Sequence, residues 1–138
     1  MLRDFDDCKT ARIDDEPRDV DFHRSTGLLG ARRIGRSLYL HLSQPDARVV
    51  LAHNPKPHVH VREANCILRH AVIARHAVEF TAEAVQERTI TLAGFKPEAS
   101  VTLEWDGQQR LTTADEKGRV NIRLKGGGKT RVVASTNP

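Results

Sequence analysis

The sequence is poor in aromatic residues. Only six of its 138 residues carry an aromatic ring: Phe5, Phe22, Tyr39, Phe80, Phe95 and Trp105. A hydrophobic core must therefore be built mainly from Val, Leu, Ile and Ala. The shortage of rings also argues against a module that stacks sugars on aromatic side chains, because strand alternation turns only Tyr39 outward.

Cysteine is equally scarce, with Cys8 and Cys66 far apart and no C-x-x-C spacing. The spacing leaves open whether they pair. Because no export signal is recognised, we expect two reduced thiols.

Long apolar runs are missing as well. No segment has the length and apolar character of a membrane span, and Met1-Leu2 leads into RDFDDCK rather than into a signal peptide. We therefore expect no membrane partner and a cytoplasmic location if the chain is complete. If it is a fragment of a longer exported protein, a secreted or periplasmic location is expected instead.

The net charge of +4 is distributed unevenly along the chain. Residues 1–22 carry eight acids and four bases, which gives −4, so the remaining residues carry +8. The basic residues are spread out, apart from Arg32-Arg33, and are typical of a solvated face rather than of a nucleic-acid interface. We expect no nucleic-acid partner.

Residues 1–22 are rich in Asp and show no sustained hydrophobic period, which sets them apart from the rest of the chain. We expect residues 1–35 to form an acidic, mobile leader and a linker, and residues 36–138 to form the folded domain.

Residues 36–138 show the alternation typical of antiparallel strands. The segments RSLYLHL (36–42), HVHVR (58–62) and VTLEW (101–105) alternate apolar with polar residues, and Asp106-Gly107 predicts a hairpin turn. Extended helical patterns are missing between these segments. The sequence therefore predicts an all-β fold, an antiparallel immunoglobulin-like β-sandwich of about eight or nine strands.

The order of parts in the last fifty residues carries a family resemblance. Ile90–Gly94, Pro97, Val101–Gly107 and Thr113–Val120 follow one another as in immunoglobulin-like and fibronectin type III-like modules. The chain resembles the accessory sandwich at the C-terminal end of many glycan-processing enzymes. The resemblance implies a spacer, a packing partner or a binding surface, and it implies no catalytic residue.

The sharpest side-chain pattern is the pair His58-x-His60. Residues i and i+2 of a strand share one face, so two imidazoles could approach one metal ion. His41 is expected to face outward on its strand, and His53 precedes a Pro-Lys-Pro bend. If His41 or His53 supplied further ligands, neutral imidazoles would suit Zn, Cu or Ni. The alternative is that all four are surface histidines.

Recognisable catalytic motifs are lacking, including G-x-S-x-G and H-E-x-x-H. We therefore predict a non-catalytic accessory or interaction module without a cofactor. It would bind another protein or a glycan-associated partner through edge strands or a basic face. The first alternative is a metal-binding domain using His58 and His60, and the second is an enzyme. The oligomeric state is left open.

Overall fold

The computed structural model describes residues 9–42 and 46–136. These residues form thirteen strands. In chain order the strands are β1 (Lys9–Ile13), β2 (Asp19–Val20), β3 (Leu28–Ile34), β4 (Ser37–Leu42), β5 (Leu51–Ala52), β6 (His60–Ala64), β7 (Ile67–Ala74), β8 (Ala77–Ala84), β9 (Arg88–Ala93), β10 (Ser100–Trp105), β11 (Gln108–Thr113), β12 (Val120–Leu124) and β13 (Gly128–Ser135).

The fold class predicted from the sequence is confirmed. All paired strands are antiparallel, and the described residues contain no helix. The strand count is thirteen rather than eight or nine. The difference arises chiefly before residue 53, where short strands form in segments that the sequence does not mark by clear alternation.

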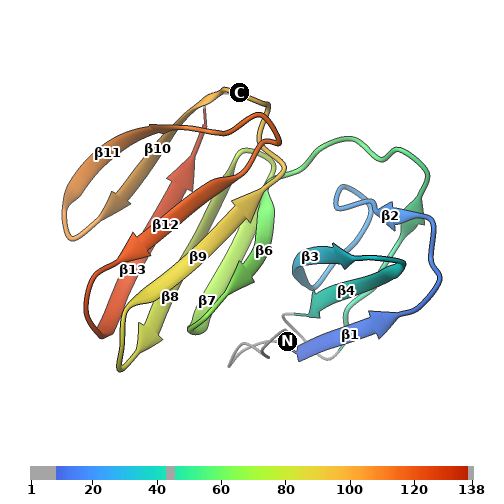
Figure 1. Ribbon diagram of the computed structural model, residues 1–138, viewed down its shortest axis with the longest axis horizontal. Coiled ribbons are helices and arrows are strands. Elements are labelled where there is room, and N and C mark those ends of the chain that lie inside the picture. Colours follow the sequence, from blue (N-terminus) through green and yellow to red (C-terminus); the bar gives the residue numbers. More distant parts are fainter. Residues whose placement is uncertain (1–8, 43–45, 137–138) are drawn as a thin grey trace.

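The C-terminal part, β6 to β13, is a sandwich of two sheets (Figure 1). One sheet has the order β11-β10-β13-β8-β7, and the other has the order β12-β9-β6. Their inner faces share one core, and its most deeply buried side chains are Val61, Leu68, Val78, Phe80, Ala82, Leu92, Val101, Val132 and Ala134. This core contains two buried aromatic rings, Phe80 and Phe95, with Trp105 packed against it, and is otherwise mainly aliphatic, as the aromatic shortage requires.

Strand alternation positions this core. Val101 and Leu103 on β10 are buried, and so are Val120, Ile122 and Leu124 on β12. The Asp106-Gly107 hairpin is confirmed, since Trp105 pairs with Gln108 across the turn. β12 then crosses to the other sheet beside β9, and β13 returns between β10 and β8, which is a Greek-key path.

The N-terminal part, up to residue 52, forms its own small sheets. β4 lies between β1 and β3, and β2 pairs with β5. A second core fills this part, made of Val20, Leu28, Ala31, Leu38 and Leu40. Leu38 and Leu40 face inward, as the alternation of RSLYLHL (36–42) predicts.

Part of the predicted leader and linker is therefore folded. Residues 1–8 lie outside the described residues, but β1, β2 and β3 form between residues 9 and 34. The expected boundary at residue 36 falls within the β3–β4 hairpin, where Ile34 pairs with Ser37. The sequence did not reveal these strands because they form by pairing with distant segments. Lys9–Ile13, for example, pairs with Ser37–Leu42.

The two parts meet where β3 packs against β6. Leu29 of β3 belongs to the sandwich core. The next residue, Gly30, lies so close to β6 that a Cβ atom there would overlap the carbonyl oxygen of Val61. His41 of β4 is fully buried at the same junction, with its Nε2 3.0 Å from the carbonyl oxygen of Arg62. The junction is thus a close backbone contact with a buried imidazole beside it.

Cys66 is a free and buried thiol, and burial raises its pKa to about 11. Cys8 lies outside the described residues. Within the described part of the chain, no helix has the length and apolar character to cross a membrane.

Replacing Gly30 tests the junction. Gly30→Ala should lower the free energy of unfolding by about 2 kcal/mol or more, because the added methyl group forces β3 away from β6. Urea unfolding followed by tryptophan fluorescence and far-UV circular dichroism would measure the loss.

Gly35→Asn is the matched control. Gly35 lies in the β3–β4 turn with open space around it and a φ of 59°, which asparagine tolerates. Its free energy of unfolding should stay within about 1 kcal/mol of the wild type. Equal stability of the two variants would show that the β3–β6 contact does not hold the two parts together.

Candidate functional site

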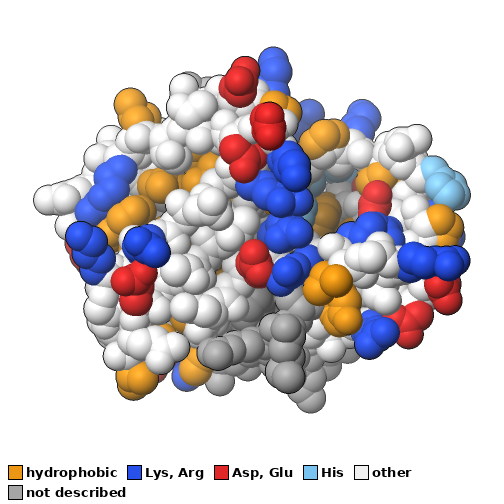
Figure 2. All heavy atoms as spheres, viewed as in Figure 1, with side chains coloured by type: hydrophobic (Ala, Val, Ile, Leu, Met, Phe, Trp, Pro, Cys, Tyr) orange, Lys and Arg blue, Asp and Glu red, His pale blue; other side chains and the backbone are white. Residues whose placement is uncertain are grey.

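A cleft of about 290 Å³ lies at the junction between the N-terminal sheets and the sandwich. Figure 2 shows Lys and Arg side chains gathered in a column along this junction. The lining residues come from β2 and the loop after it, from β3, β4, β6 and the end of β9, and from the loops that precede β6 and β12. They are Asp19, Val20, Phe22, Ala31, Arg32, Arg33, Leu38, Pro55, Lys56, Pro57, His58, His60, Arg62, Ala93, Gly94, Lys117 and Arg119.

Positive charge dominates this lining. Six of the residues are lysine or arginine, and Asp19 is the one carboxylate among them. The six are far apart in the sequence, and Arg32-Arg33 is their one adjacent pair. We call the site the basic cleft.

A tight turn before β12 presents Lys117 and Arg119. The Asp115 carboxylate accepts hydrogen bonds from the backbone N–H groups of Lys117 and Arg119, at 2.8 and 2.9 Å. These two bonds hold the pKa of Asp115 below its usual value. Gly118, with a φ of 75°, packs directly against the carbonyl oxygen of Phe95. The carbonyl oxygen of Gly118 accepts a hydrogen bond from the backbone N–H of Phe95 at 3.1 Å. The carboxylate thus fixes the backbone of the turn, while the Lys117 side chain extends into solvent.

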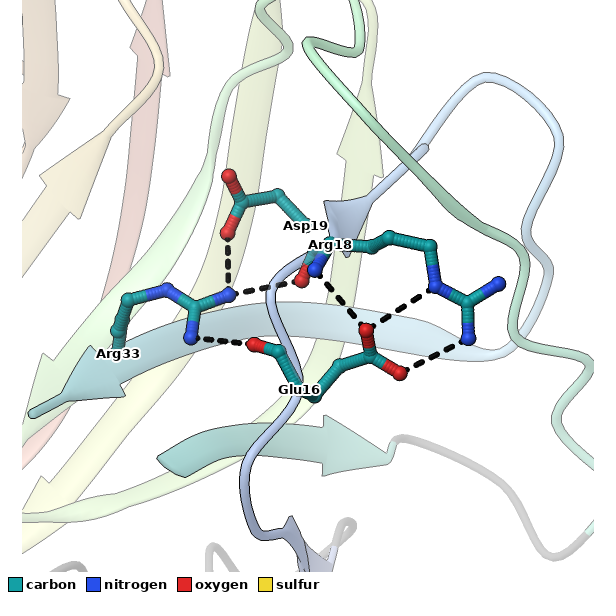
Figure 3. A network of polar contacts seen from close by, with 4 residues as sticks. All are labelled: Glu16, Arg18, Asp19 and Arg33. Carbon is teal, nitrogen blue, oxygen red and sulfur yellow. Dashed lines mark hydrogen bonds and ion pairs between the residues drawn. The ribbon is translucent and has the colours of Figure 1, made fainter. Parts of the chain in front are cut away.

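Arg33 anchors the opposite wall (Figure 3). Its guanidinium donates to the carbonyl oxygens of Glu16 and Arg18, both at 2.7 Å, and to the Asp19 carboxylate at 2.8 Å. Glu16 and Arg18 form a two-bond ion pair that lowers the pKa of Glu16 to about 2. The segment before β2 is therefore held on β3 by charge-assisted hydrogen bonds.

Arg32 and Arg62 share one carboxylate, that of Glu63. The Arg32–Glu63 distance is 2.6 Å and the Arg62–Glu63 distance is 3.4 Å. Burial lowers the pKa of Arg62, and the nearby charges of Arg119 and Arg32 lower it further. The Nε of Arg32 is buried without a hydrogen-bond partner among the described residues. Positive charge is therefore only partly neutralised here.

The three remaining cations, Lys56, Lys117 and Arg119, form no ion pair with any carboxylate in the described residues. They reach the cleft from the loop before β6 and from the turn before β12. The basic cleft therefore has an excess of positive charge at its mouth.

His58 and His60 line the inner part of the cleft. As predicted they lie opposite a buried valine face, formed by Val59 and Val61. The Nδ1 of His58 lies 2.8 Å from the carbonyl oxygen of Val59, and that of His60 lies 2.9 Å from the carbonyl oxygen of His58. Each Nδ1 therefore carries the proton and donates it, because a carbonyl oxygen can only accept a hydrogen bond.

Two neighbours from the N-terminal part cover these imidazoles. The Phe22 ring stacks on His60 with centroids 4.6 Å apart, and His23 meets His58 edge-on at 4.9 Å. Burial lowers the pKa of His60 to about 4 and also lowers the pKa of His58. Both rings are neutral near pH 7.

The structure therefore brings together two of the four predicted metal ligands. His41 is buried rather than outward, because its ring reaches the carbonyl oxygen of Arg62 on β6, and it lies close enough to His60 to lower that pKa. His53 is exposed in the loop before β6 and does not line the cleft. Among the described residues no three His, Cys, Asp or Glu side chains are grouped as a metal ion requires.

Sequence reasoning missed Phe22, Lys56, Lys117 and Arg119 as members of one site. A local signal existed for the turn, since Asp115-Glu116-Lys117-Gly118 is typical of a turn held by an Asp side chain. No local signal could place Phe22 against His60, because that contact depends on how β2 is positioned in the fold.

A wider hollow of about 760 Å³ lies around Val85 and Gly127, at the other end of β12. It is lined by one cation, Lys129, and one carboxylate, Glu83. Its charges balance, so it lacks the convergent set of groups that marks the basic cleft.

Comparison with protein-family models, with curated proteins and with solved structures finds no match for this chain. The likeness to immunoglobulin-like and fibronectin type III-like modules therefore stays a prediction from the sequence.

The neutral His60 makes stability depend on pH. Its folded pKa of about 4 lies below its ordinary value of 6.5, so the unfolded chain binds more protons between these values. Stability should be complete above pH 6.5 and fall as the pH is lowered toward 4. We expect a loss of about 2 kcal/mol between pH 7 and pH 5 from urea unfolding curves.

His60→Gln should flatten this dependence, because glutamine does not titrate. His53→Gln, at an exposed position, should leave it unchanged. The groups that face His60 include His41, His58 and the Phe22 ring. If His60→Gln kept the wild-type slope, another of these groups would carry the proton uptake.

The metal hypothesis has a direct test. In a zinc titration followed by imidazole NMR signals, we expect shifts of His58 and His60 that do not saturate near one equivalent, because two ligands leave the site open. Saturation at one equivalent, lost in a His58→Ala, His60→Ala double variant, would instead establish a metal site.

Proposed function

We propose that this protein is a non-catalytic interaction module that holds an acidic group of a protein partner in the basic cleft. The observation that carries the proposal is the set of three cations, Lys56, Lys117 and Arg119, that line the cleft without a carboxylate partner in the described residues. An acidic group entering the cleft would supply the missing counter-charge.

The way in which the turn is built supports this assignment. Asp115 uses its carboxylate on backbone N–H groups and so fixes the backbone from which the Lys117 and Arg119 side chains extend before any partner arrives. A preorganised backbone loses less conformational entropy on binding than a flexible loop. The Arg33 network holds the opposite wall in the same way.

The histidines supply an uncharged wall of the cleft. The Nδ1 atoms of His58 and His60 donate to backbone carbonyl oxygens. Burial lowers both pKa values, so neither ring adds positive charge near pH 7, and the charge of the cleft comes from its lysines and arginines.

The edge-strand route predicted from the sequence is a second candidate. β11 is an outer strand of the five-stranded sheet, and its Leu111 side chain is 81% exposed. An accessory role of the kind that the family resemblance implies is compatible with either surface, because the cleft and β11 involve different residues.

Charge removal at the turn tests the proposal. A hexaglutamate peptide should bind the wild-type protein at low salt and more weakly as salt is raised, because exposed charges are screened. In the Lys117→Gln, Arg119→Gln double variant the dissociation constant should rise at least about tenfold, since one charged contact is worth about 1.5 kcal/mol. Isothermal calorimetry or NMR titration would measure it.

The matched control is the Lys125→Gln, Lys129→Gln double variant. It removes the same charge from exposed positions beyond the other end of β12. It should bind the peptide within about twofold of the wild type. Equal losses in the two variants would mean that net charge alone attracts the peptide and that the cleft is not the site.

A further inference from the structure

The cations at the mouth of the basic cleft outnumber the charges that a single carboxylate could supply. Lys56, Lys117 and Arg119 form no direct ion pair in the described residues, and Arg62 shares Glu63 with Arg32. The Asp115 carboxylate interacts electrostatically with Lys117 and Arg119, but its hydrogen bonds go to their backbone N–H groups. A carboxylate offers one charge and two oxygens. A phosphate monoester offers close to two charges and three terminal oxygens at neutral pH.

The acids at the cleft are already engaged. Asp19 accepts from Arg33 at 2.8 Å, and Glu63 accepts from Arg32 at 2.6 Å. Neither is available to neutralise the turn before β12. An incoming dianion would also relieve the repulsion between Arg62 and Arg119 that accompanies the lowered pKa of Arg62.

The size and the rim of the cleft favour one anionic group over a long polyanion. About 290 Å³ is at the small end of ligand sites, which span about 300 to 1,000 Å³. The exposed Asp115 and Glu116 adjoin Lys117 in the chain. In Figure 2 acidic side chains lie beside one end of the basic column. A continuous nucleic-acid backbone would meet these acids.

The inner walls are suited to the carbon part of an ester. Phe22, Pro55 and Pro57 line the cleft together with the neutral rings of His58 and His60. A group with a charged end and an uncharged stem would therefore find both surfaces in one site.

From these observations we infer that the basic cleft binds a phosphate monoester, carried either by a phosphorylated side chain of the partner or by a small phosphate ester. The inference rests on one part of the proposed function, the binding of an anionic group in the basic cleft, and it names the chemical class of that group.

The test uses the full chain and three peptides of one Gly-Ala sequence that differ at the central residue, which is phosphoserine, glutamate or serine. Inorganic phosphate and free O-phosphoserine distinguish a small ligand from a phosphorylated chain. An oligothymidine tests nucleic acid. Binding is followed by ¹H–¹⁵N NMR, including arginine Nε–H signals, on the wild type, the Lys117→Gln, Arg119→Gln variant and the Lys125→Gln, Lys129→Gln control.

The expected result is that the phosphoserine peptide binds at least about tenfold more tightly than the glutamate peptide. The serine peptide should cause no shifts. The shifts should centre on Arg62 and Gly118, and they should disappear in the cleft variant but not in the control.

Other outcomes separate the two proposals. Equal binding of the glutamate and phosphoserine peptides through the cleft would overturn the phosphate inference and leave the interaction function standing. Binding of inorganic phosphate or O-phosphoserine as tight as that of the peptide would support the phosphate site and contradict a protein partner. Tighter binding of oligothymidine at the cleft, or no binding of any probe, would overturn both.

Discussion

The close approach of β3 to β6 is the contact on which the rest of the structure depends. It requires a residue without a side chain at Gly30, whose backbone lies against the carbonyl group of Val61. Leu29 extends from the same strand into the sandwich core, so one short segment belongs to both parts. Because the contact sets the separation of the two parts, it also sets the width of the basic cleft.

Around this contact the protein places groups that are costly to bury, and it provides a partner for most of them. His41 faces a backbone carbonyl, Arg33 is satisfied by three oxygens, and the ring of His60 is covered by Phe22. Lys56, Lys117 and Arg119 at the mouth of the cleft form no ion pair in the described residues, because solvent reaches them and hydrates their charge. Fixed polar contacts at the base of the cleft and open charges at its rim are the arrangement expected of a rigid site that receives an anion.

The sequence was sufficient for the sandwich and insufficient for the site. Alternation at Val101–Trp105 and at Val120–Leu124 predicts both strands and their buried faces, because each side chain lies on one side of its own strand. The N-terminal strands have little local pattern, and Lys9–Ile13 is a strand because Ser37–Leu42 pairs with it. The basic cleft is harder still to predict from local sequence patterns, because its residues are distant in the chain. Lys56 and Arg119 are 63 positions apart in the chain and line one site only after both sheets have formed.

The position of the cleft between two separate cores has a consequence for how occupancy and conformation are coupled. Its walls belong to different packing units, joined through the chain by the Pro55–Pro57 connection. A local opening that moves the N-terminal sheets away from the sandwich would dismantle the site while leaving the sandwich core intact. An anion bound between the walls would then act as a non-covalent clasp, suppress such openings and make the connection harder for a protease to reach.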